Sequence, residues 1–171
     1  MVMEIKKYGD SVLREKSLPV SEITPEIQKI IDEMIGIMYR APGVGLAAPQ
    51  IGISQRIIVA DPSEGKEIGR LLVLINPAIV SAEGEIVAEE GCLSVPDVTA
   101  EVKRSSRVIV EGLNRQGRKV QIEGENHLAR ILQHEIDHLE GVLFIDRLGF
   151  FERQMLLRKW RKRHRKSHAR K

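Results

Sequence analysis

The sequence predicts an α+β fold, in which one strand-rich domain has antiparallel sheets packed around a central helix. Two segments, 24–40 and 126–141, repeat apolar residues every three or four positions, which is typical of helices that face a core. Between them, from residue 56 to 122, short apolar or alternating runs are separated by turn residues, as in antiparallel strands. The 171 residues are enough for one core, and no repeat or linker divides them.

The N-terminal part of the chain combines an irregular segment with the first helix. Residues 1–22 show no periodic pattern, so we expect irregular chain there. Thr24, Pro25 and Glu26 are typical of a helix start, because threonine caps, proline fits the first turn and glutamate favours the helix dipole. The apolar stripe that follows predicts a helix as far as Arg40, packed on the core.

The segment Ala41–Gln50 is rich in glycine, alanine and proline, which predicts a loop rather than a helix or strand. Its small residues let other backbone approach closely, and Gln50 supplies an amide that can donate a hydrogen bond. Its Gly-x-Gly is not a dinucleotide fingerprint, because a third glycine and a preceding strand are missing. Read alone, the segment is compatible with a structural or a functional loop.

The middle of the chain predicts strands in alternation with turns. Glu83-Gly84-Glu85 predicts the tip of a hairpin, and Asn114-Arg115-Gln116-Gly117 predicts another turn. The expected strands are 56–60, 71–75, 78–80, 86–88, 98–103, 107–113 and 119–122. After the helix at 126–141 we expect a short strand at 142–145 and a last helix from Phe150 to about Lys166.

The helix at 126–141, which Gly141 would end, carries two histidines four residues apart. Positions i and i+4 share one helix face, so His134 and His138 can direct their imidazoles at one divalent metal ion. Glu135 lies beside that ion and not on it, where its carboxylate can take a proton from bound water. Two incidental histidines in a buried helix are the weaker interpretation, because the whole motif is present.

A third ligand has to come from elsewhere, and Cys92 is the candidate. A lone cysteine is more often a small buried hydrophobe, but this one lies in a non-repetitive segment between Gly91 and Leu93. Two imidazoles and one thiolate would leave a fourth position open for water, which is a catalytic arrangement. A single cysteine excludes an internal disulfide and fits a reducing compartment.

The overall composition favours a soluble protein, with 42% hydrophobic and 30% charged residues. No apolar run approaches the ~20 residues of a membrane span, and the N-terminus lacks the apolar core of a signal peptide. We therefore expect a cytoplasmic protein. The charge is uneven, because residues 158–171 hold nine Lys or Arg and no Asp or Glu, while the rest of the chain is acidic. We expect residues 1–157 to form a single metallohydrolase domain and residues 158–171 a basic extension of the last helix.

Three short segments resemble the signatures of the peptide deformylase family, in the same order. They are Gly43 to Gln50 (GVGLAAPQ), Glu90 to Ser94 (EGCLS) and His134 to Gly141 (HEIDHLEG), and together they cover 21 positions. The strand-rich middle is similar to this family's α+β fold, and the basic helical C-terminus is similar to its bacterial form that ends in a helix.

The resemblance implies removal of the formyl group from the N-formylmethionine of newly made polypeptides. A metal-bound hydroxide would attack the formyl carbon, with Glu135 as general base and then acid. The Gln50 side chain and the Leu93 N–H would stabilise the oxyanion. Cys92, His134 and His138 would hold the metal, which is Fe(II) in this family, although zinc, nickel or cobalt also suits these ligands. The residues expected near the substrate methionine are Gly43, Val44, Gly45, Glu90 and Ile131.

Two residues near this site have alternative roles. Glu90 also fits a role in orienting the loop that carries Cys92. Asp137 points away from the ligand pair, where it could form a structural ion pair or support a ligand from outside the site, and we favour the structural ion pair.

The basic residues at 158–171 are compatible with a solvated end, an anionic membrane surface or RNA phosphates. The resemblance favours docking at the ribosome exit region, with neither membrane nor DNA as a partner.

Three other functions share some of these features. A zinc peptidase of the general His-Glu-x-x-His class shares the helix, but it does not generally use a Gly-Cys-Leu ligand loop. A non-catalytic ribosome-binding protein could keep the fold, although every proposed catalytic residue is present. A relative that acts on another formyl amide stays open, as does the oligomeric state.

Overall fold

The computed structural model describes residues 2–168 and confirms an α+β fold in one domain. The helices are α1 (Pro25–Arg40), α2 (Asn126–Leu139) and α3 (Phe150–His168), with short 3-10 turns η1 (Ser11–Arg14), η2 (Ala48–Ile51) and η3 (Phe144–Arg147). The strands are β1 (Gly45–Ala47), β2 (Ile57–Ala60), β3 (Leu72–Glu83), β4 (Ile86–Cys92), β5 (Val95–Arg104), β6 (Arg107–Leu113) and β7 (Lys119–Glu125).

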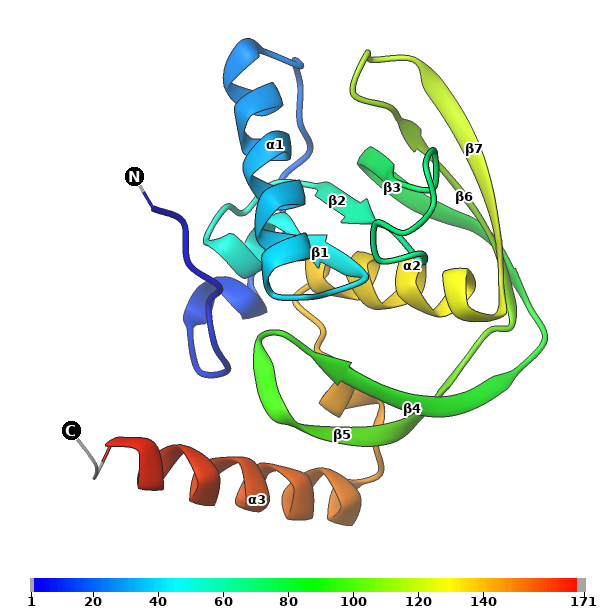
Figure 1. Ribbon diagram of the computed structural model, residues 1–171. Coiled ribbons are helices and arrows are strands. Elements are labelled where there is room, and N and C mark those ends of the chain that lie inside the picture. Colours follow the sequence, from blue (N-terminus) through cyan, green and yellow to red (C-terminus); the bar gives the residue numbers. More distant parts are fainter. Residues whose placement is uncertain (1, 169–171) are drawn as a thin grey trace.

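Two antiparallel sheets enclose α2. The larger sheet has the strand order β1-β2-β3-β6-β7, and β4 pairs only with β5 in a separate hairpin. Figure 1 shows α2 between the larger sheet and this hairpin, with α3 along the outer side of the hairpin. The helix that carries the two histidines is therefore covered on both sides, as the sequence predicts.

Three clusters of apolar side chains hold these layers together. The first joins α1 to β1, β2 and η2, and includes Ile31, Met34 and Met38, which are fully buried. The second joins α2 to the larger sheet through residues such as Leu132 and Leu139. The third lies between the hairpin, η3 and α3. Because α2 has apolar contacts with the sheet on one side, its histidines are left to face the other.

The helix predictions for 24–40, 126–141 and 150–166 are confirmed within two residues at each end. Thr24 caps α1 by accepting a hydrogen bond from the Ile27 N–H. The irregular N-terminal segment contains one short 3-10 turn, η1. None of the helices in residues 2–168 is both long and apolar enough to cross a lipid bilayer.

Several strand predictions are wrong in ways that have physical causes. The expected strand at 142–145 is a turn, because the Asp146 carboxylate accepts the Leu143 N–H and the chain folds into η3. Leu143, Phe144 and Ile145 are buried in this turn, and a short apolar run in the sequence does not distinguish a buried turn from a buried strand. The expected strands at 71–75 and 78–80 are one strand, β3, interrupted by an irregularity where Asn76 has a φ of +53°.

The expected hairpin at 83–85 is also wrong. Gly84 has a φ of +70° and does turn the chain, but β3 pairs with β6 and β4 pairs with β5. The turn therefore transfers the chain from the larger sheet to the hairpin. The segment 41–50, predicted as a loop, contains the short strand β1 and the turn η2.

Candidate metal centre and active site

Three side chains from two separate elements converge to form a candidate metal site. Cys92 ends β4, where the pairing with β5 shifts register after Gly91, and His134 and His138 lie one turn apart on α2. One ligand atom from each residue lies within 4.8 Å of the others, and the Cys92 Sγ is 3.3 Å from the His138 Nε2. Both histidines are buried. One thiolate and two imidazoles are a donor set that suits a divalent transition metal.

The charges around these ligands favour the thiolate form of Cys92 and the protonated form of His134. Burial alone would raise the pKa of the Cys92 thiol, but the neighbouring His138 and the hydrogen bonds from both histidines hold it well below its usual range. Burial alone would lower the pKa of His134, but its hydrogen bonds to Cys92 and Glu90 hold it well above its usual value. A thiolate is the form of cysteine that binds a metal, whereas His134 has to release a proton to a bound ion.

Glu135 lies in the cleft next to the converging ligands. Its side chain is buried, and its Oε2 atom has no hydrogen-bond partner among the described residues. Burial raises the pKa of this carboxyl group. A β-carbon added at Gly45 would lie 2.6 Å from the Glu135 Oε1, so glycine is needed there for the carboxylate to occupy its place. An unpartnered buried carboxylate is a candidate for proton transfer.

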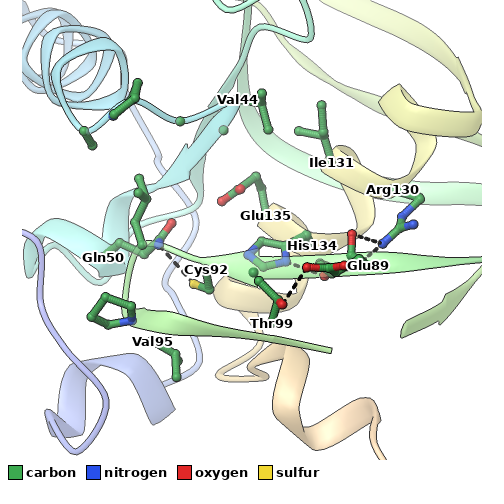
Figure 2. A pocket seen from close by; sticks show the side chains of 18 of the residues that line it. Val44, Gln50, Glu89, Cys92, Val95, Thr99, Arg130, Ile131, His134 and Glu135 are labelled. Carbon is green, nitrogen blue, oxygen red and sulfur yellow. Dashed lines mark hydrogen bonds and ion pairs between the residues drawn. The ribbon is translucent and has the colours of Figure 1, made fainter. Parts of the chain in front are cut away.

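Gln50 directs its amide nitrogen at the same place. The side-chain Oε1 of Gln50 accepts the Ala47 N–H at 2.9 Å, which fixes the orientation of the amide. Its Nε2 then donates to the Ser94 Oγ at 3.2 Å and lies 3.6 Å from the Cys92 Sγ. Figure 2 shows Gln50 beside Cys92, with Glu135 and His134 across from them. An N–H donor is thus held in the site by a backbone hydrogen bond made in η2.

Glu90 supports His134 from behind the site. The Oε1 of Glu90 lies 2.5 Å from the His134 Nδ1, and its carboxylate also pairs with Arg104 and Arg130. A histidine that bonds through Nδ1 leaves Nε2 for a metal. Asp137 pairs with Arg104 and Arg147, which agrees with the structural ion pair expected from the sequence.

A cleft of about 790 Å³ opens beside the ligand residues. Gly43, Val44, Gly45, Glu90 and Ile131 all line it, as do Cys92, Leu93, His134 and Glu135. Figure 2 places Val44 and Ile131 together on one side of the cleft, where they form an apolar wall. The structure therefore brings together every residue that the sequence singles out for this site, with Gln50 at its inner edge.

Sequence reasoning missed the arginines around Glu90. Arg104 is almost fully buried and Arg130 is 8% exposed, although arginine is normally a surface residue. Nothing in the local sequence distinguishes Arg104 from its exposed neighbours. Arg130 had one usable signal, because it lies four residues before His134 and so on the same helix face.

An α+β fold with a Cys-His-His site, an unpartnered glutamate and an adjoining cleft defines a metal-dependent hydrolase. The comparison with known families is more specific. A family model described as polypeptide deformylase matches residues 2–154, and the chain belongs to this family.

Individual relatives agree with this assignment. A peptide deformylase of Thermodesulfovibrio yellowstonii is 51% identical over 160 residues, which cover 94% of this chain and 97% of the relative. One from Halothermothrix orenii is 54% identical over 155 residues, with 91% and 99% covered. The crystal structure of a peptide deformylase from Legionella pneumophila superposes with a TM-score of 0.92 at 44% identity, covering 100% of this chain and 99% of that one.

Family membership makes this chain a hydrolase that removes the N-formyl group from nascent polypeptides, and a metal-dependent one. It decides against a general zinc peptidase and against a non-catalytic ribosome-binding protein.

Proposed function

We propose that the chain removes the formyl group of N-formylmethionyl polypeptides at a divalent ion held by Cys92, His134 and His138. The observation that carries this proposal is the buried, unpartnered Oε2 of Glu135 beside three converging ligand atoms. When bound, the ion supplies Lewis acidity that makes water easier to deprotonate and a carbonyl easier to attack. Fe(II) is the ion we propose, as the family resemblance implies, and zinc, nickel and cobalt suit the same donor set.

Glu135 moves the proton. Its carboxylate takes a proton from the attacking water and gives it to the amine that leaves when the formyl C–N bond breaks. Burial raises the pKa of Glu135, which makes its carboxylate a stronger base than an exposed one. Because Gly45 has no side chain, the carboxylate can occupy the space next to it.

Gln50 and the backbone N–H of Leu93 stabilise the negative charge that develops on the formyl oxygen. The Gln50 amide suits this role because Ala47 holds its oxygen and leaves the NH₂ group directed into the site. Leu93 follows the ligand Cys92 directly and packs near Gly43, where an added β-carbon would lie 3.0 Å from its side chain.

The small residues beside Glu135 favour a formyl group over an acetyl group. A formyl carbon carries only hydrogen, and the space next to Gly45 is already occupied by a carboxylate. Val44 and Ile131 form the apolar wall for the methionine side chain. The peptide deformylase of Synechococcus elongatus, 42% identical with a TM-score of 0.88 and 92% of this chain and 86% of that one covered, was crystallised with actinonin. We expect actinonin to bind this cleft too.

The test compares formate release from formyl-Met-Ala-Ser with acetate release from acetyl-Met-Ala-Ser, using anaerobically prepared protein of measured metal content. Replacing Glu135 by Gln should lower kcat ~100- to 10,000-fold while metal content stays the same. Glu140→Gln, directly after the last residue of α2, is the matched control and should retain full activity. A Glu135→Gln variant with wild-type activity would refute the assigned mechanism.

The last helix supports a second part of the proposal, docking of α3 at the ribosome exit region. The exposed residues Arg158, Arg161, Lys162 and Arg165 line one surface depression on α3. Leu157 and Trp160 face inward, and Trp160 packs edge-on against Tyr8. The helix therefore packs on the rest of the domain through its apolar side and presents positive charge to solvent, where it could contact RNA phosphates.

The extension expected at residues 158–171 therefore begins within a helix that still contacts the body, and residues 169–171 lie outside the described residues. A truncation at 157 would remove Trp160, so charge substitution is the cleaner test. Combining Arg158→Gln, Arg161→Gln and Lys162→Gln should weaken ribosome binding and flatten its salt dependence. The same charge loss through Arg70→Gln, Arg118→Gln and Lys119→Gln is the control. Equal ribosome affinity of the two triple variants would exclude this docking site.

A further inference from the structure

The three candidate ligands lie on two elements whose backbones are not paired with each other. Cys92 belongs to the β4–β5 hairpin, which forms its own sheet, while His134 and His138 belong to α2. A metal site requires its ligand atoms to hold their mutual distances closely. Some contact between the hairpin and the helix must therefore fix the position of Cys92 relative to the two histidines.

Arg104 makes such a contact from the end of β5. Its side chain is 3% exposed, and it connects two carboxylates, one on each element. Toward the hairpin, its Nε donates to the Glu90 Oε2 at 2.9 Å and its Nη2 donates to the Glu90 Oε1 at 2.5 Å. Toward the helix, its Nη1 donates to the Asp137 Oδ2 at 2.9 Å. The guanidinium is planar and rigid, so these three bonds fix the two carboxylates relative to each other.

Both carboxylates are linked to the ligand residues of α2, one by a hydrogen bond and one by its place in the helix. Glu90 lies two residues before Cys92 on β4 and accepts a hydrogen bond from the His134 Nδ1. Asp137 lies between His134 and His138 on α2. One side chain therefore holds the strand that carries the thiolate, the ring orientation of one histidine and the helix segment that carries both.

We propose that Arg104 is a positioning residue, which sets the geometry of the metal site by clamping the cysteine-bearing hairpin onto the histidine-bearing helix. This inference rests on the proposed metal site. Arg104 is not among the described residues that line the cleft, so it acts on the ligands and not on the substrate.

Arg130 supplies a second attachment that separates positioning from folding. From α2, its Nη2 donates to the Ala88 carbonyl at 2.9 Å and to the Glu90 Oε2 at 3.0 Å. Its bonds run to the hairpin backbone and to one oxygen of Glu90, with no link to Asp137. Loss of Arg104 should thus leave the hairpin attached to α2, while Glu90 keeps only one bond to a guanidinium and orients the His134 ring less firmly.

The experiment replaces Arg104 by Met and by Lys in the full chain and measures Zn²⁺ affinity by chelator competition, with the visible spectrum of the Co²⁺-loaded protein as a second measurement. Arg104→Met should lower Zn²⁺ affinity ~10- to 100-fold, as loss of groups that orient metal ligands does, and should change the Co²⁺ spectrum. With saturating metal, kcat for formyl-Met-Ala-Ser should fall while KM stays within about twofold. Arg104→Lys should recover part of the affinity, because an ammonium keeps the charge but not the planar fork.

Arg107→Met is the matched control. Arg107 follows Arg104 by three residues and also pairs with carboxylates, but it lies at the surface. It should leave Zn²⁺ affinity and the Co²⁺ spectrum unchanged. A purely structural role would lower the unfolding midpoint of Arg104→Met without altering either metal measurement, and that result would overturn the inference. If Arg104→Met does not fold, Asp137→Asn weakens the helix side of the clamp together with the pair to Arg147, and wild-type Zn²⁺ affinity in that variant would equally overturn it. Failure of the wild-type chain to bind Zn²⁺ would instead refute the proposed metal site.

Discussion

Arg104 and Arg107 lie three residues apart, on either side of the passage from β5 to β6, and each holds several carboxylates. Arg104 belongs to what we call the inner cluster, which consists of Glu90, Arg104, Arg130, His134, Asp137 and Arg147. Arg107 belongs to the outer cluster, which consists of Glu83, Arg107, Glu123 and Glu125. The side chain of Arg104 is 3% exposed and that of Arg107 is 36% exposed.

The two clusters show that burial, and not the number of ion pairs, decides what an arginine does. In the inner cluster all charges except that of Arg147 are shielded from water, so a lost partner leaves another buried charge uncompensated. In the outer cluster water and salt can replace each partner at little cost. The inner cluster also includes a candidate metal ligand, His134, and the outer cluster includes none.

Removing Glu90 should produce the largest difference between the clusters. Glu90→Ala leaves Arg104 and Arg130 without their shared carboxylate and should lower the free energy of unfolding by about 3–5 kcal/mol. Glu123→Ala, the corresponding change in the outer cluster, should shift the urea midpoint little. Urea unfolding of both variants in the presence of chelator, so that metal affinity does not contribute, measures the two effects. Equal losses would show that burial does not separate the clusters.

Acid should weaken the contribution of Glu90 to stability. Burial alone would raise the pKa of Glu90, but its hydrogen bonds with Arg104 and His134 hold it well below its usual range. Because the pKa is lower in the folded than in the unfolded state, the contribution is complete above the unfolded value of about 4.3 and is lost as the pH falls through the folded value. The difference in unfolding free energy between wild type and Glu90→Gln should therefore be constant from pH 7 to 5 and shrink below about pH 4. A difference that grows on acidification would contradict the assigned shift.

The sequence alone could predict the ligands but not the cluster that supports them. The helical spacing of His134 and His138 and the isolation of Cys92 are visible because metal chemistry requires particular residue types at particular intervals. Arg104 and Arg107 stand in similar strand-end sequences, and only the packing of the hairpin against α2 buries one of them. A long-range contact of this kind has no local pattern.

The same limit explains the errors in the fold. The turn at Gly84 was predictable from its residues, but strand pairing was not, because β3 pairs with β6 and not with its neighbour in sequence. Leu143, Phe144 and Ile145 are apolar residues buried in a turn, and a hydrogen bond from the Leu143 N–H to Asp146 decides their conformation.

Arg147 tests the boundary between the two kinds of cluster. It is bonded to Asp137 through two nitrogens, but its side chain is 47% exposed, whereas that of Arg104, which bonds to the same carboxylate, is 3% exposed. Arg147→Gln should lower the free energy of unfolding by less than about 1 kcal/mol, as for exposed ion pairs, because Asp137 keeps its buried partner. Chemical unfolding measures this change, and Zn²⁺ affinity should remain at the wild-type value. A loss as large as that of Glu90→Ala would place Arg147 in the buried class.

Salt should produce the smallest effect and should act on one cluster only. At 1 M NaCl the Debye length falls to about 3 Å, so pairs that water reaches lose most of their attraction while buried pairs are screened much less. Any stability difference between wild type and Arg107→Gln at 0.05 M NaCl should therefore disappear at 1 M, whereas the difference between wild type and Glu90→Gln should persist. Urea midpoints at the two salt concentrations measure both. If salt removes the Glu90→Gln difference as well, water reaches Glu90, and Arg104 then lacks the dry surroundings that its positioning role requires.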